Sequence, residues 1–148
     1  MKPLLLSILL IICSPAFADN TIEENKQKTI QTRAILIGKW CGNQQLLNGD
    51  HQIWTVNRYA SGTYKINVTL TKKDGEKSTW GEYGIWGVRY PIYFTAARGF
   101  IENKKRFPAD TTSADLYDAF TIKSVTAQDF TYQSLTSGNT YTVSKRCR

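Results

Sequence analysis

The sequence predicts an all-β fold: a single antiparallel up-and-down barrel of about eight short strands, preceded by a short helix. Two observations predict this class. From residue 36 onward, apolar and polar residues alternate with a period of two, and turns containing Gly, Asn, Asp or Ser interrupt the alternation about every eight to twelve residues. Cys41 and Cys147 lie near the two ends of this region. A bond between them would join the first strand to the last, as a closed sheet allows.

Residues 1–18 have the composition of a secretory signal peptide. Lys2 gives a positive start, residues 4–13 are apolar, and Ala-Phe-Ala at 16–18 is a small-x-small cleavage site. The apolar stretch is too short to span a membrane. We therefore expect an exported protein, periplasmic or secreted, whose mature chain has 148 − 18 = 130 residues and forms one domain.

The expected export also explains the cysteines. In an oxidising compartment Cys41 and Cys147 are expected to form a disulfide across 147 − 41 = 106 positions. The alternative is two separate buried thiols.

The chain is basic, with a formal net charge of +7, or 7 − 1 = +6 without Lys2. This charge favours acidic partners, such as lipid head groups or acidic polysaccharides, although solubility alone also explains it. No nucleic-acid motif and no long basic run on one helix is present in the sequence, so nucleic acid is not an expected partner.

A helical segment is expected at 19–35, before the barrel at 36–148. Asn20 or Thr21 can cap a helix whose first turn carries Glu23 and Glu24, because acidic side chains suit the positive end of a helix. The helix is expected from about residue 22 to about residue 33, against one end of the barrel.

The strands follow from the alternation and the turns between them. They are expected at 38–41, 52–59, 63–71, 80–89, 90–95, 117–123, 130–135 and 140–147. Residues 97–114 are expected to form a long irregular loop, of the kind that acts as a lid or binding loop on small β domains.

These features resemble the lipocalin-type barrels, or calycins. The similarity rests on Gly38-x-Trp40 in the first strand, on the eight-strand meander and on a basic residue at the end of the last strand. Residues 54–64 also resemble small exported bacterial domains of this type. The resemblance implies that Trp40 packs under the barrel floor and that Arg146 or Arg148 lies across it.

The expected strand faces suggest a ligand site inside the barrel. Trp54 and Arg58 share one face of their strand, as do Glu82 and Trp86 on another. If these faces point inward, Arg58 and Glu82 could form an interior ion pair, since charges are rarely buried without a partner. The predicted ligand-binding residues are Trp54, Arg58, Tyr64, Glu82 and Trp86. The alternatives are that the two charges lie at the rim, and that the aromatic residues simply fill a small barrel.

No catalytic constellation is apparent. His51 is the one histidine and stands beside a turn, so neither a histidine-rich metal site nor a Ser-His-Asp triad is expected. Glu82 with Tyr83 or a nearby Asp offers the only candidates for acid–base chemistry. We expect no enzyme, no cofactor and no metal.

Two functions remain. The first is an exported non-enzymatic binding protein that holds a small apolar or amphipathic ligand in a barrel cup. The alternative is an envelope interaction or inhibitor module with a filled barrel, which contacts an acidic component or a protein through the 97–114 loop and its basic residues Lys104, Lys105 and Arg106.

Overall fold

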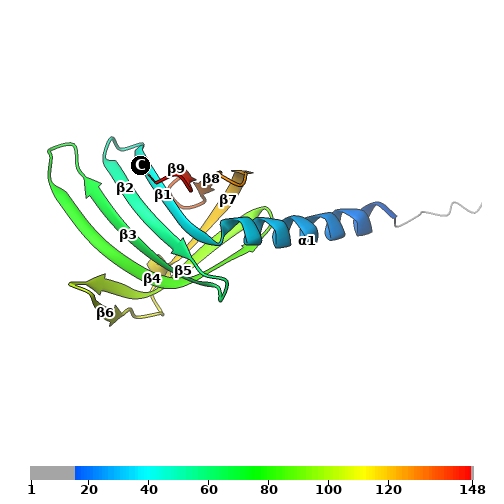
Figure 1. Ribbon diagram of the computed structural model, residues 1–148, viewed down its shortest axis with the longest axis horizontal. Coiled ribbons are helices and arrows are strands. Elements are labelled where there is room, and N and C mark those ends of the chain that lie inside the picture. Colours follow the sequence, from blue (N-terminus) through cyan, green and yellow to red (C-terminus); the bar gives the residue numbers. More distant parts are fainter. Residues whose placement is uncertain (1–15, 148) are drawn as a thin grey trace, which may run out of the picture.

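The computed structural model describes residues 16–147, which form a long helix and nine strands (Figure 1). The elements in chain order are α1 (Ala16–Leu36), β1 (Gly38–Gln45), β2 (His51–Arg58), β3 (Thr63–Thr71), β4 (Lys77–Arg89), β5 (Ile92–Glu102), β6 (Lys105–Pro108), a 3-10 turn (Ala114–Leu116), β7 (Tyr117–Val125), β8 (Asp129–Ser134) and β9 (Thr140–Ser144).

Eight of the strands close into an antiparallel barrel. Hydrogen bonds join them in the order β4-β3-β2-β1-β9-β8-β7-β5, and pairing of β4 with β5 closes the ring. Strand β6 pairs only with the end of β5 and stays outside the ring. The predicted fold class, an eight-stranded barrel with one N-terminal helix, is confirmed.

The barrel is closed at the end where α1 joins it. Leu36 and Trp40 are completely buried there, and the Trp40 indole Nε1 donates a hydrogen bond of 2.9 Å to the Leu36 carbonyl. Trp40 thus lies at the barrel floor, as the resemblance implies. The cation over its ring is Lys145, with Nζ 5.0 Å from the ring centroid. Arg146 is exposed instead, and Arg148 lies outside the described residues.

Only the C-terminal half of α1 packs on the barrel. Thr32 is buried, Arg33 Nη2 donates to the Ala60 carbonyl at 2.8 Å, and the Tyr90 backbone N–H donates to Thr29 Oγ1 at 3.0 Å. The rest of α1 projects away from the barrel (Figure 1). The helix covers the expected segment and also residues 16–18 of the predicted signal peptide, whose other residues lie outside the described range. Within that range no helix is long and apolar enough to cross a bilayer.

The prediction of one long loop at 97–114 is wrong for most of its length. Residues 97–102 continue β5, and residues 105–108 form β6. The pairing of β4 with β5 changes register between Tyr83 and Gly84, which leaves Arg98 as an extra residue in β5. A bulge of this kind shifts a period-two pattern by one position, and the strand is then hard to recognise from sequence.

The seam between β1 and β9 has the shortest ladder of the ring. Two residue pairs join the strands, Cys41 with Ser144 and Gly42 with Val143. The side-chain amide of Gln44 extends the seam, because it donates to the Thr140 carbonyl at 2.8 Å and accepts from the Thr142 N–H at 3.2 Å.

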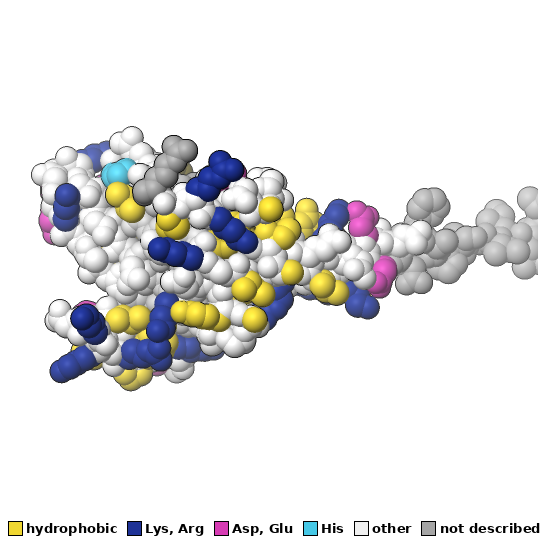
Figure 2. All heavy atoms as spheres, viewed as in Figure 1, with side chains coloured by type: hydrophobic (Ala, Val, Ile, Leu, Met, Phe, Trp, Pro, Cys, Tyr) yellow, Lys and Arg dark blue, Asp and Glu magenta, His cyan; other side chains and the backbone are white. Residues whose placement is uncertain are grey.

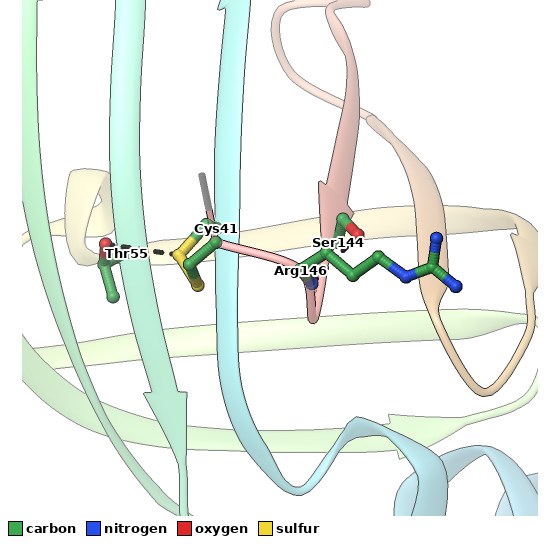
Figure 3. The surroundings of a disulfide bond; sticks show 5 residues. Cys41, Thr55, Ser144 and Arg146 are labelled. Atoms are coloured by element: carbon green, nitrogen blue, oxygen red, sulfur yellow. Dashed lines mark hydrogen bonds between the residues drawn. A yellow bond between two sulfur atoms is a disulfide. The ribbon is translucent and has the colours of Figure 1, made fainter.

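The predicted disulfide reinforces this seam. Cys41 and Cys147 are bonded, with Cα atoms 5.3 Å apart. Strand β9 ends at Ser144, three residues earlier than predicted, and the following bend carries Cys147 to β1 (Figure 3). The Arg146 side chain points away from the disulfide in the same view.

Candidate functional site: a cup inside the barrel

A cavity of about 360 Å³ occupies the barrel above its floor. It extends from Arg58 near the floor to Thr136 and Ser137 in the exposed β8–β9 turn, where it reaches solvent. This cavity is called the cup. It is lined by Gln52, Trp54, Val56, Arg58, Tyr64, Ile66, Val68, Trp80, Glu82, Tyr93, Thr95, Asp118, Phe120, Tyr132, Ser134, Thr136, Ser137 and Tyr141.

Arg58 supplies a cation at the bottom of the cup. Its side chain is among the most buried of the described residues, with only 2% of the residue exposed. Its Nε donates a hydrogen bond of 3.1 Å to the Tyr93 hydroxyl, and the guanidinium carbon lies 5.0 Å from the Tyr93 ring centroid. The Nη1 nitrogen is buried and has no hydrogen-bond partner within residues 16–147.

The predicted ion pair between Arg58 and Glu82 is not formed. In the part of the chain that the structure describes, the three ion pairs are all exposed and lie elsewhere. The Glu82 carboxylate instead accepts a hydrogen bond from the Tyr64 hydroxyl. Glu82 stands on β4 and Tyr64 on the neighbouring β3, so the carboxylate is held toward β3.

Burial raises the pKa of the Glu82 carboxyl; the hydrogen bond from Tyr64 opposes this rise, and the nearby negative charge of Asp118 adds to it. The pKa of Asp118, which lines the cup from β7, is also raised by burial. Burial and the Glu82 charge raise the pKa of the Tyr64 phenol, which therefore stays neutral. The cup thus has one cation at its floor and two carboxyls on its wall.

Aromatic side chains form about half of the remaining wall. Tyr93 stacks on Phe120 with ring centroids 5.4 Å apart, and Tyr132 stacks on Tyr141 at 5.5 Å. Trp54 lies flat against β1 because Gly42 has no side chain, and a Cβ there would stand 2.1 Å from the indole. The aromatic residues therefore pack against one another and still leave a cavity open above Arg58.

Four of the five predicted ligand-binding residues line the cup: Trp54, Arg58, Tyr64 and Glu82. Trp86 does not line it. Its indole Nε1 donates to the Tyr59 carbonyl at 3.2 Å, and Arg33 of α1 lies over its ring. Trp86 is on the expected face of β4 but near the closed end, where it supports the helix.

The structure adds wall residues that sequence reasoning missed, chiefly Asp118, Phe120 and Tyr132. Tyr132 alternates with polar residues on a predicted strand, and Phe120 shares a strand face with Ile122, so the period-two pattern could have found both. Asp118 stands beside the 3-10 turn and has the sequence context of a turn residue.

Outside the cup, His51 Nε2 lies 2.7 Å from Asn43 Oδ1 in an exposed pair. Across residues 16–147 no three His, Cys, Asp or Glu side chains are placed to hold a metal ion together.

The comparisons with known proteins show similarity in structure only. No protein-family model matches the chain, and no curated protein matches it. A solved structure of a de novo designed, fluorescence-activating beta barrel aligns with a TM-score of 0.44 and 12% identity, over 78% of this chain and 97% of that one. At this score the likeness gives no information about what this chain binds.

Proposed function

We propose that this protein is an exported, non-enzymatic binding protein whose cup holds a small amphipathic ligand by its anionic end. The supporting observation is the buried Nη1 of Arg58, which has no partner within the described residues. Burying a charged donor without a partner is costly. A carboxylate, sulfonate or phosphate at the floor would accept the free N–H groups and balance the charge.

The rest of the cup suits an apolar ligand body. Its volume of about 360 Å³ lies within the range of small-molecule sites, which are mostly apolar with few polar groups. Trp54, Tyr132 and Tyr141 offer flat apolar surface above the cation. Export is supported by the signal-like segment 1–18 and by the disulfide.

The test replaces Arg58 with Met, which keeps an apolar side chain of similar length. Two probes small enough for the cup are titrated by calorimetry: toluenesulfonate, which carries an anion, and toluene, which does not. We expect Arg58→Met to weaken the sulfonate about 10- to 100-fold, the value of a hydrogen bond to a charged group, and to leave the neutral probe unchanged.

The control variant is Arg33→Met, which removes a guanidinium that also lies over an aromatic ring, that of Trp86, but is outside the cup. It should change neither probe. Thermal unfolding separates binding from folding, because Arg58→Met removes an unpaired buried charge and should not lower Tm. Equal loss of both probes, or a large fall in Tm, would show that Arg58 serves the fold and not an anion.

A second candidate function is contact with an acidic envelope component. The β5–β6 hairpin presents Lys104, Lys105 and Arg106, all exposed, and basic side chains gather over this hairpin in Figure 2. Such a cluster attracts anionic surfaces.

We expect Lys104→Glu with Lys105→Glu to reduce sedimentation with phosphatidylglycerol vesicles and to leave sulfonate binding in the cup intact. The matched control is Lys72→Glu with Lys73→Glu in the β3–β4 turn. Equal sedimentation of both variants would contradict this candidate.

A further inference from the structure

The β5–β6 hairpin continues the inner wall of the barrel beyond the ring of eight strands. The strand registers place one row of directly opposed residues across β2, β3, β4, β5 and β6: Val56, Ile66, Glu82, Phe100 and Phe107. Directly opposed residues share a face of the sheet. The first three residues of the row line the cup. Phe100 and Phe107 therefore point to the same side of the sheet as the cup lining.

These two phenylalanines lie where the ring has opened. Strand β7 pairs with β5 only over residues 92–96, so beyond residue 96 no strand of the described chain continues the ring on that side of the hairpin. Phe100 is 38% exposed and Phe107 is 47% exposed. Figure 1 shows the hairpin bending away from the other strands, and Figure 2 shows the surface hollowed between the hairpin and the strands above it.

The basic side chain of Arg106 lies on the opposite face of the hairpin from Phe100 and Phe107. Arg106 opposes Ile101 and is therefore on the other face, where its guanidinium carbon lies 5.0 Å from the Tyr83 ring centroid. On the cup side, Glu82 stands between Ile66 and Phe100, but its carboxylate is bonded to Tyr64 on β3. The polar group is thus turned away from Phe100.

We propose that Phe100 and Phe107 form an apolar shelf that receives the part of the ligand too long for the cup. This inference rests on the proposed function, with the anion at Arg58. It specifies the ligand class as a single-chain anionic amphiphile. One water molecule occupies about 30 Å³ in the liquid, so a cup of about 360 Å³ has room for about a dozen heavy atoms. A longer chain emerges from the cup, and the shelf is the apolar surface that continues the cup wall.

The experiment measures the dissociation constants of straight-chain carboxylates from octanoate to hexadecanoate, by displacement of the sulfonate probe below their micelle concentrations. The proteins are the wild type, Phe100→Ser/Phe107→Ser, and the control Phe94→Ser. Phe94 lies on the same strand and is 39% exposed, but it is next to the inward-facing Tyr93 and so points outward.

Octanoate and decanoate should bind all three proteins equally. From dodecanoate onward the wild type and Phe94→Ser should gain about twofold in affinity per methylene, half the value of full burial because the shelf is open on one side. Phe100→Ser/Phe107→Ser should gain nothing. Circular dichroism of each variant confirms that the barrel is intact.

The other outcomes overturn the proposal. If the long chains gain equally in the wild type and the double variant, the shelf is wrong while the cup stands. If octanoate also weakens in the double variant, the phenylalanines shape the cup and receive no tail. If the double variant binds every carboxylate like the wild type but has a smaller mass in analytical ultracentrifugation, the shelf binds a second copy of the chain. If no carboxylate binds the wild type, the proposed anion site fails and the shelf with it.

Discussion

Arg58 is the residue on which the chemistry of the cup depends. Burial removes water from its guanidinium, so neighbouring groups must replace that hydration. Here the ring faces of Tyr93 and Phe130 take over part of the solvation, with ring centroids 5.0 and 5.7 Å from the guanidinium carbon. Among the described residues they leave the buried Nη1 without a hydrogen-bond partner, and the proposed anionic ligand would offset this cost.

The carboxyls of Glu82 and Asp118 should make the free energy of unfolding fall as pH rises. Their pKa values are raised in the folded protein, chiefly by burial. At a pH between the ordinary and the raised pKa, the folded state binds more protons than the unfolded state. The contribution of these carboxyls to the free energy of unfolding is therefore complete below this pH range and is lost as pH rises through it. Glu82→Gln and Asp118→Asn should therefore raise the free energy of unfolding at neutral pH. Urea denaturation from about pH 4 to about pH 8 measures this.

Asp110 provides a control of opposite sign. Hydrogen bonds from Thr112 lower the pKa of its carboxyl, so its contribution is present above the ordinary pKa and is lost as pH falls. Asp110→Asn should reduce stability at neutral pH, and the difference from the wild type should vanish in acid. A loss of stability at neutral pH in Glu82→Gln would contradict the expected effect of burial.

Strand alternation is sufficient to predict which side chains face inward, but not which of them meet. The inward positions of Trp54, Arg58, Tyr64 and Glu82 follow from a period of two. Their heights along the barrel do not follow, because these depend on the registers between strands. For this reason Glu82 meets Tyr64 and not Arg58, and Trp86 is placed at the closed end.

At the scale of elements, the β1–β9 seam is where the ring has the fewest backbone pairs. Within the described chain, only Cys41 and Gly42 of β1 pair with β9. The disulfide links this point across 106 residues of sequence. In the chain-entropy view such a bond acts mainly on the unfolded chain, because it removes the freedom of a long loop.

Cys41→Ser with Cys147→Ser should lower the free energy of unfolding by up to about 4–5 kcal/mol, the loop-entropy estimate for this separation. Hydrogen exchange should accelerate most in β1 and β9, because a short ladder and the Gln44 amide are what remain at their seam. Dithiothreitol should reproduce the effect in the wild type and add nothing to the double variant. A uniform acceleration across all strands would show that the disulfide stabilises the whole barrel and not this seam.

The elements predicted best from sequence are those with undisturbed alternation. Strand β3 begins and ends at the predicted residues, 63 and 71. The predicted strand at 90–95 is shorter than β5 because Arg98 is an extra residue in its ladder, and no local pattern marks a bulge. The helix is located correctly. Its apolar Ile22 and Ile30 are exposed, and Thr32 and Leu36 are the buried residues.

At the scale of the molecule, the closed ring follows from the number of strands and from the cysteines near the two ends of the barrel region. The open volume above Arg58 does not follow in the same way, because the same aromatic composition could fill a small barrel. It depends on packing details such as Gly42, which lets the Trp54 indole lie against β1 and leaves the barrel axis free.

Helix α1 leaves the barrel at its closed end, opposite the turns around the mouth of the cup (Figure 1). A sensor chip that captures the protein through α1 therefore leaves the mouth directed toward the flowing sample. Amine coupling at random is less suitable, because Lys72 and Lys73 belong to the β3–β4 turn at the mouth end. Attachment there would turn the opening toward the chip.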